Sequence, residues 1–280
     1  MENPYLIEGP ALISFSGGRT SAFMLHEILK AHDGQLPPDV HVVFANTGKE
    51  REETLHFVHE CGARWGVDIA WVEFRKRSGH AEGRYERVGF NSASRNGEPL
   101  AALIAAKKFM PNSVMRFCTE DAKVNTIRFY LEAEHGLKGG KKVIGLRHDE
   151  GYRLLKGYAK NAEGNDPWPR YYPLDKARVT KADVMDFWAN QPFDLGLRPY
   201  EGNCDLCFLK GRGTLKAIIR ENPGAADWWI EQERVGNGRF VKDYSFTDLL
   251  REVQQQPHFF DEPIDAEHDA ECGDFCEPDK

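Results

Sequence analysis

The sequence lacks any apolar run that approaches the roughly 18–20 residues required to cross a bilayer. Its opening residues, Met1 to Pro4, contain no basic cluster, and no signal-peptide core follows them. The six cysteines argue against a disulfide framework in a chain with these cytosolic features. No internal repeat or low-complexity tract is present. We therefore expect a cytoplasmic, globular protein with no membrane partner.

An excess of basic charge is also missing, although the acidic balance is confined to one end. The net charge is −7, and residues 261–280 hold nine Asp or Glu and one Lys, a local sum of −8. The other 260 residues hold 36 basic and 35 acidic groups, so we expect a nearly neutral body and an acidic, mobile tail. One segment of the body has the charge to meet a phosphate-bearing substrate or a nucleic-acid backbone, with a solvated loop as an equal alternative. Its basic residues are Arg75, Lys76, Arg77, Arg84, Arg87 and Arg95.

Apolar runs alternate with helical patterns along most of the chain. We expect strands at 11–16, 41–46, 68–74 and 141–146, an edge strand at 171–174, and helices at 20–31, 99–108 and 119–135. Thr47 with Glu50, and Thr180 with Asp183, have the spacing of capping boxes that start further helices. Residues 75–98 have no clear period, which indicates an insertion or an active-site lid. This order predicts an α/β fold with a doubly wound, mostly parallel sheet that binds ligands at the carboxyl ends of its strands.

The segment SGGRTS, residues 16–21, follows the first apolar run and opens the first helix. Its glycines allow close approach of the backbone to a ligand, and the N–H groups of a helix start attract anions. Hydroxyl groups and the charge of Arg19 add further donors. The segment is neither a Walker loop nor a GxGxxG fingerprint. We interpret it as a phosphate-binding loop, against the alternative of a glycine-rich turn without a ligand.

Three cysteines have the surroundings of metal ligands or nucleophiles. Cys118 precedes Thr119, a candidate N-cap, so its thiolate is favoured at a helix start with Arg116 and Lys123 nearby. Cys204 and Cys207 form a CxxC that can converge on one metal ion. Cys61, in contrast, fits a buried core position in a helix.

Four motifs, in order, resemble the phosphoadenosine phosphosulfate (PAPS) reductase family of the PP-loop adenine nucleotide alpha hydrolase superfamily. They are SGGRTS, RFCTEDAK at 116–123, GLRHDEGYR at 145–153 and the CxxC segment at 202–211, and the resemblance spans roughly residues 11–210. It implies a PP-loop, HUP-like domain over 1–197 that binds ATP, adenosine phosphosulfate (APS) or PAPS. We expect a helical CxxC subdomain over 198–260, with short helices at 215–221, 225–232 and 246–255. An acidic tail over 261–280 follows it.

The resemblance also suggests roles for individual residues. The expected nucleotide-binding residues are Ser16, Gly17, Gly18, Arg19, Thr20, Ser21, Asn46, Arg147, Asp149 and Glu150. Arg147 and Arg19 would hold the phosphosulfate, while Asp149 or Glu150 would hold a ribose hydroxyl or Mg²⁺. For this last segment the alternative is a surface ion pair with Arg153.

The resemblance also implies an iron–sulfur cluster, most simply 4Fe-4S, on Cys118, Cys204 and Cys207, with Cys276 or Cys272 as a fourth ligand. Structural zinc and inert or redox thiols are the alternatives. Glu271-Cys272-Gly273 partly matches the catalytic motif of the reductases, which makes Cys272 the expected nucleophile. Two departures stand out: Arg19-Thr20 replaces the Lys-Asp of the ATP-using branch, and Cys118-Thr119 replaces a Cys-Cys pair.

Three functions follow as expectations. The first is sulfonucleotide reduction or sulfur transfer, with a thiol or reductase as electron donor. The second is ATP-dependent thiolation of a nucleic acid or small molecule by an open cluster. The third is a zinc-stabilised nucleotide sensor or nucleic-acid-binding module. A homodimer is compatible with each of them.

Overall fold

Short apolar strands build one six-stranded sheet in the computed structural model, which describes residues 3–76, 84–255 and 264. Its strands are β1 (Ala11–Ser14), β2 (Val40–Asn46), β3 (Ile69–Phe74), β4 (Tyr85–Val88), β5 (Lys141–Val143) and β6 (Arg170–Tyr171). Their order across the sheet is β4-β3-β2-β1-β5-β6. Every neighbouring pair is parallel except β3 and β4. The expected α/β fold with a mostly parallel sheet is confirmed.

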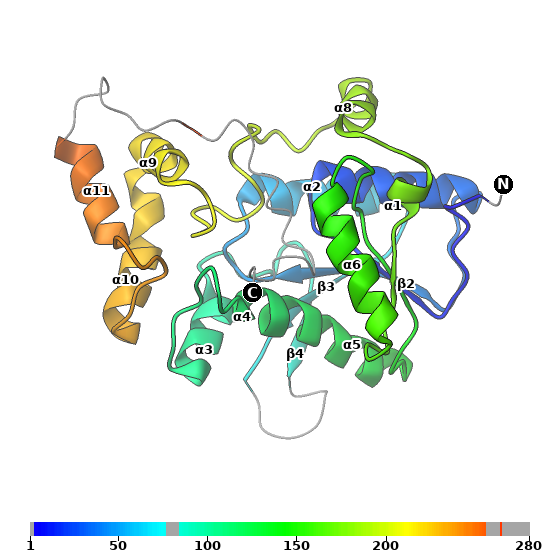
Figure 1. Ribbon diagram of the computed structural model, residues 1–280, viewed down its shortest axis with the longest axis horizontal. Helices are drawn as coiled ribbons and strands as arrows, with labels where there is room; N and C mark the ends of the chain where they lie inside the picture. The colour runs from blue at the N-terminus through cyan, green and yellow to red at the C-terminus, as the bar shows by residue number, and fades with distance from the viewer. Residues whose placement is uncertain (1–2, 77–83, 256–263, 265–280) are drawn as a thin grey trace.

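Helices cover both faces of this sheet (Figure 1) because its strands are apolar on both sides. One face, with Ile13 and Val42, packs on α1 (Arg19–Ala31), α2 (Glu52–Trp65) and α8 (Lys181–Ala189) in the largest apolar cluster. The other face, with Leu12 and Val43, packs on α5 (Thr126–His135). Cys61 lies fully buried in the first cluster, as predicted.

The C-terminal helices form an apolar cluster beside the sheet (Figure 1). They are α9 (Arg212–Glu221), the short 3-10 helix η3 (Pro223–Ala226), α10 (Asp227–Gly236) and α11 (Phe246–Gln255). Their cluster includes Leu100 and Leu103 of α3 (Glu98–Lys107) and Phe117 of α4 (Phe117–Thr119). The helical part is therefore packed against elements that belong to the α/β region.

Several expected boundaries are wrong. The strand at 141–146 ends at Val143, and the edge strand ends at Tyr171, where Pro173 begins the one-turn helix α7 (Pro173–Lys176). The helix expected at 119–135 is α4, a π-helical segment η2 (Glu120–Asn125) and α5 in succession. Thr119 is therefore inside the helical stretch, and its N-cap is Arg116. The capping box of Thr180 and Asp183 is confirmed at the start of α8.

Two elements lie where the pattern gave no signal. Residues 75–98 contain β4, so this segment is partly an edge of the sheet. Helix α6 (Gly151–Glu163) follows β5 directly and buries only Leu154 and Gly157. No helix in the described ranges is long and apolar enough to span a membrane.

Candidate functional site

The sheet has its topological switch point between β1 and β5. From β1 the order runs through β2 to β3 on one side, whereas β5 and β6 lie on the other. In such sheets, ligands bind beyond the carboxyl ends of the strands at this point. The two segments that leave it touch each other. A Cβ added at Gly145 would lie 3.2 Å from the Cα of Ser21.

Residues 16–18 form a tight turn at this point and lead into the first turn of α1, and we call residues 16–21 the nucleotide loop. Gly17 has φ +80°, and a Cβ there would lie 2.8 Å from the Cγ2 of Thr54, so both backbone and space require glycine. Gly18 is the N-cap of α1. Ser16 donates to the hydroxyl of Ser21 at 2.9 Å, and Ser21 donates to the Gly18 carbonyl at 2.9 Å. A helix leaves its first N–H groups without intrahelical partners, and such a position can accept an anion, so the predicted role of this loop stays a prediction.

The Arg19 side chain is bound by another part of the chain. Its Nε donates to Asp194 Oδ1 at 2.7 Å, and its Nη2 lies 2.5 Å from Asp194 Oδ2. The same Nη2 donates to the Leu197 carbonyl at 3.2 Å. The guanidinium of the loop is thus held by the segment that follows α8.

Arg147 joins the second segment to the loop. Its side chain is buried, and its Nη1 donates to the Thr20 hydroxyl at 3.1 Å. Its Nε donates to Asp149 at 3.0 Å, and its backbone N–H donates to Glu150 at 2.9 Å. Asp149 also accepts from the N–H of Lys181 at 2.9 Å, at the start of α8. Burial alone would raise the pKa of Asp149, but this bond and the Arg147 charge outweigh it and lower the pKa.

Glu150 has a second partner, because it forms an ion pair with Arg153. This is the contact that the alternative interpretation of the segment expected. The carboxylates of Asp149 and Glu150 therefore bind groups of the protein itself, among them Arg147. Their roles toward a ribose or Mg²⁺ stay predictions.

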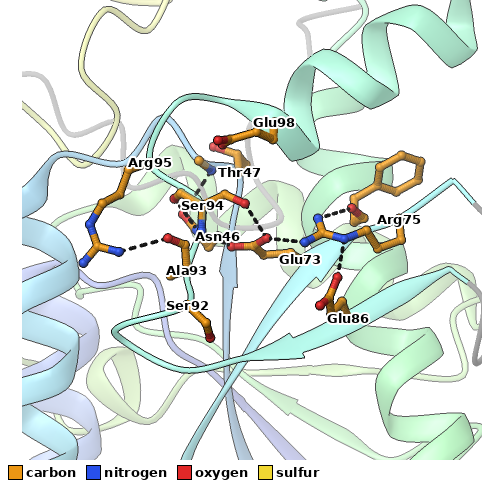
Figure 2. Close-up of polar contacts among 12 residues, drawn as sticks. Asn46, Thr47, Glu73, Arg75, Glu86, Ser92, Ala93, Ser94, Arg95 and Glu98 are labelled. Carbon is orange, nitrogen blue, oxygen red and sulfur yellow. Dashed lines mark hydrogen bonds and ion pairs between the residues drawn. The ribbon is translucent and has the colours of Figure 1, made fainter.

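Asn46 is part of a buried network at the ends of β2 and β3 (Figure 2), whose centre is the fully buried Glu73. The carboxylate of Glu73 accepts from the Asn46 amide at 2.7 Å, from the Ser94 N–H at 2.6 Å and hydroxyl at 2.7 Å, and from Arg75 at 2.9 Å. The side-chain oxygen of Asn46, Oδ1, accepts from the Gly48 N–H at 3.0 Å. Asn46 thus holds the turn after β2, and sequence reasoning missed Glu73.

A second buried carboxylate, Glu50, joins three segments. It accepts from the N–H and the hydroxyl of Thr47, both at 2.8 Å, but α2 begins only at Glu52, so the expected capping box does not start that helix. Its other oxygen lies 3.1 Å from Lys123 Nζ and 3.8 Å from Cys204 Sγ. Burial would raise the pKa of Glu50, but the Lys123 charge and the Thr47 bonds outweigh it and lower the pKa.

The CxxC segment is fastened to the same edge of the sheet. Asn203 donates from its amide to the Ser16 carbonyl at 2.9 Å, which ties it directly to the nucleotide loop. The Asp205 N–H donates to the Lys49 carbonyl at 3.0 Å, and the two side chains pair at 2.7 Å. The CxxC segment therefore contacts the nucleotide loop at Asn203, one residue before Cys204.

The predicted cluster ligands are not gathered in the same way. Among the residues that the structure describes, no three His, Cys, Asp or Glu side chains form a group that could hold a metal ion. Cys207 is buried and Cys118 and Cys204 are half-buried, whereas Cys272 and Cys276 lie outside the described residues. The described donors do not by themselves form a site for a cluster or a zinc ion.

The basic segment is largely neutralised. Arg75 pairs with Glu73 and Glu86, Arg87 with Asp68, and Arg95 with Glu52. Arg84 lies over the ring of Phe129, and Arg77 falls outside the described residues. These pairs weaken the electrostatic case for a nucleic-acid surface here, because a carboxylate partner cancels the charge that a phosphate would meet.

The model of the phosphoadenosine phosphosulfate reductase domain matches residues 10–174, more than half of the chain. The chain belongs to this family. Its PAPS reductase domain contains the nucleotide loop, the Cys118 helix and Arg147, whereas the CxxC lies beyond the matched range.

Two relatives carry no assigned activity. The uncharacterized nin region protein ORF290 of Escherichia phage lambda is 28% identical over 218 residues, which cover 76% of this chain and 70% of that protein. An uncharacterized protein of Methanocaldococcus jannaschii is 41% identical over 63 residues, which cover 22% of this chain and 12% of that protein. The family is nucleotide-related and belongs to sulfur metabolism, and its members are usually enzymes.

Proposed function

We propose that the protein is an enzyme that binds a sulfonucleotide, APS or PAPS, on the nucleotide loop and transfers its sulfur to a thiol. One observation carries this proposal: Asn203 bonds to Ser16 at 2.9 Å, so the loop proposed to bind an anion and the CxxC segment meet at the switch point of the sheet. A sulfonucleotide has both an anionic phosphate and an electrophilic sulfur. The family match supports the same substrate class.

In the proposed reaction, a cysteine thiolate attacks the sulfonate sulfur and displaces the nucleotide, which leaves with its phosphate. A second thiol then attacks the enzyme sulfur, releases sulfite and leaves a disulfide for an external thiol donor to reduce. Cys272 is the proposed first nucleophile from its sequence motif. Arg147, buried against Thr20, is proposed to stabilise the negative charge beside the loop.

The nucleotide loop is tested by substitution at Gly17. Gly17→Ala places a Cβ against Thr54 and forces a positive φ on alanine, so we expect APS affinity to fall at least about tenfold in calorimetry. Gly34→Ala is the matched control, because Gly34 has φ +84° and a Cβ there meets no atom within 4 Å. It bears the same backbone strain away from the loop.

Turnover then decides the reaction. Purified protein with a dithiol is incubated with APS, PAPS or ATP. Release of sulfite from a sulfonucleotide supports the proposal, whereas cleavage of ATP to AMP and pyrophosphate indicates the adenylating alternative. Unchanged binding in Gly17→Ala, with weaker binding in Gly34→Ala, would remove the loop from the site.

A further inference from the structure

Residues 188–203, which we call the connecting segment, run from α8 to the CxxC and touch the nucleotide loop at both ends. At its start, the Trp188 indole donates to the Arg19 carbonyl at 2.9 Å. At its end, Asn203 donates to the Ser16 carbonyl at 2.9 Å. Between these contacts, Arg19 binds Asp194 through two nitrogens. The connecting segment is thus hydrogen-bonded to the loop at its start, in its middle and at its end.

The Arg19 contact has the geometry of a structural clamp. Two guanidinium nitrogens face the two carboxylate oxygens of Asp194, which is the bidentate arrangement that fixes orientation as well as distance. The Leu197 carbonyl accepts a further bond at 3.2 Å. A nucleotide phosphate would have to displace a carboxylate to use the same donors.

The segment that Arg19 holds leads along the chain into the CxxC at residues 204–207, which we call the cysteine loop. Leu195 and Leu197 are buried in the apolar cluster of α1 and α2. Four residues beyond Leu197, Glu201 is buried and lies 3.1 Å from the Arg51 guanidinium. The Arg51 N–H donates to the Asn203 carbonyl at 2.8 Å.

We propose that Arg19 is a positioning residue, which holds Asp194 and Leu197 and thereby sets the place of the CxxC beside the nucleotide loop. This role rests on the proposed function only for its chemical purpose, because the clamp itself exists without a substrate. It replaces the expectation that Arg19 grips the phosphosulfate. The two roles exclude each other, because the guanidinium nitrogens of Arg19 that bind Asp194 cannot bind an anionic ligand at the same time.

Hydrogen exchange of the ligand-free full chain tests the clamp. Arg19→Ala and Asp194→Ala are each expected to speed exchange of amides in residues 190–204 about fivefold, since each removes the same charged bonds. Amides of Phe246–Gln255 are the internal control, and they should not change. The charge-swapped double variant, Arg19→Asp with Asp194→Arg, should restore slow exchange. Equal exchange in wild type and both single variants overturns the proposal, and so does a double variant as fast as the singles.

Binding of APS and ATP gives the second readout. A positioning role predicts that Arg19→Ala and Asp194→Ala change affinity in the same direction and by similar factors. A phosphate-binding role predicts opposite signs, because loss of Asp194 would release Arg19 to the nucleotide and tighten binding; this result would also overturn the proposal. If neither nucleotide binds wild-type protein, the proposed function fails, while the exchange data still decide the clamp.

Discussion

At the scale of single residues, two buried carboxylates organise the edge of the sheet where the site lies. Glu50 and Glu73 both lie at the ends of strands or just beyond them, and each is surrounded by donors from separate segments. A buried charge is tolerated only when it is paired and fully hydrogen-bonded. Such groups cost much when a partner is lost, so their role is to fix positions rather than to add stability.

Glu73→Ala should destabilise the protein strongly. It leaves the Asn46 amide, the Ser94 N–H and the Arg75 guanidinium without their buried acceptor, so we expect a loss of about 3–5 kcal/mol in the free energy of unfolding. Glu86→Ala is the control, because it removes the other carboxylate of Arg75 at a half-exposed position and should cost about 1 kcal/mol or less. Urea unfolding measures both, and equal midpoints for the two variants would contradict this account.

The sequence alone predicted the nucleotide loop but not these carboxylates, and the reason is physical. Gly17 and Gly18 closely follow an apolar run, so adjacent residues alone predict a strand that ends in a glycine turn. Glu73 meets Ser94 across 21 residues, and Glu50 meets Cys204 across 154, so both depend on how distant segments pack. Arg19 was likewise interpreted from its neighbours, while its partner Asp194 is 175 residues away.

At the scale of elements, the four central strands were all predicted, although two of them end earlier than expected, whereas helix α6 was not predicted at all. Central strands carry continuous apolar runs because both of their faces are covered, which is a strong local signal. Helix α6 buries only Leu154 and Gly157 and leaves Tyr152 and Leu155 exposed, so it contributes little apolar burial to the core. The start of α2 was misplaced because Glu50 serves Thr47, Lys123 and Cys204 instead of a helix cap.

The pairing of β2 with the end of α5 should make stability depend on pH. His41 of β2 stacks on His135 at 3.8 Å between ring centroids. Burial first, and then the neighbouring His135 charge, lower the pKa of His41, and they outweigh Asp39 and Asp68, which would raise it. The unfolded chain therefore binds the proton more readily than the folded one, and stability should fall as pH drops below about 6.5.

His41→Gln should flatten this dependence between pH 7 and pH 5, measured as the urea midpoint at each pH. His56→Gln, at an exposed position on α2, serves as the control and should keep the wild-type slope. A wild-type slope in His41→Gln would show that other groups cause the acid sensitivity.

At the scale of the whole molecule, the C-terminal helices and the α/β region share an apolar cluster. Leu215 and Trp229 lie buried together with Leu103 and Phe117, and the Trp229 indole donates to Asp205, within the CxxC, at 3.0 Å. The cysteine loop is therefore held from two sides, by the nucleotide loop and by the helices. The sequence predicted the two kinds of structure, but this shared packing depends on contacts over more than 100 residues.

The predicted division after residue 197 can be tested with the fragment 1–197. Removal of the helices would expose Leu100, Leu103, Ile104 and Phe117, and uncovered apolar side chains of this number favour association. We expect the fragment to bind the dye ANS more strongly than the full chain and to sediment as larger oligomers than the full chain. Trp229→Ala in the full chain is the companion variant, with an expected loss of about 3–5 kcal/mol from the cavity it leaves. A monomeric fragment 1–197 that binds no dye and unfolds at the full-chain midpoint would instead establish it as an independent domain.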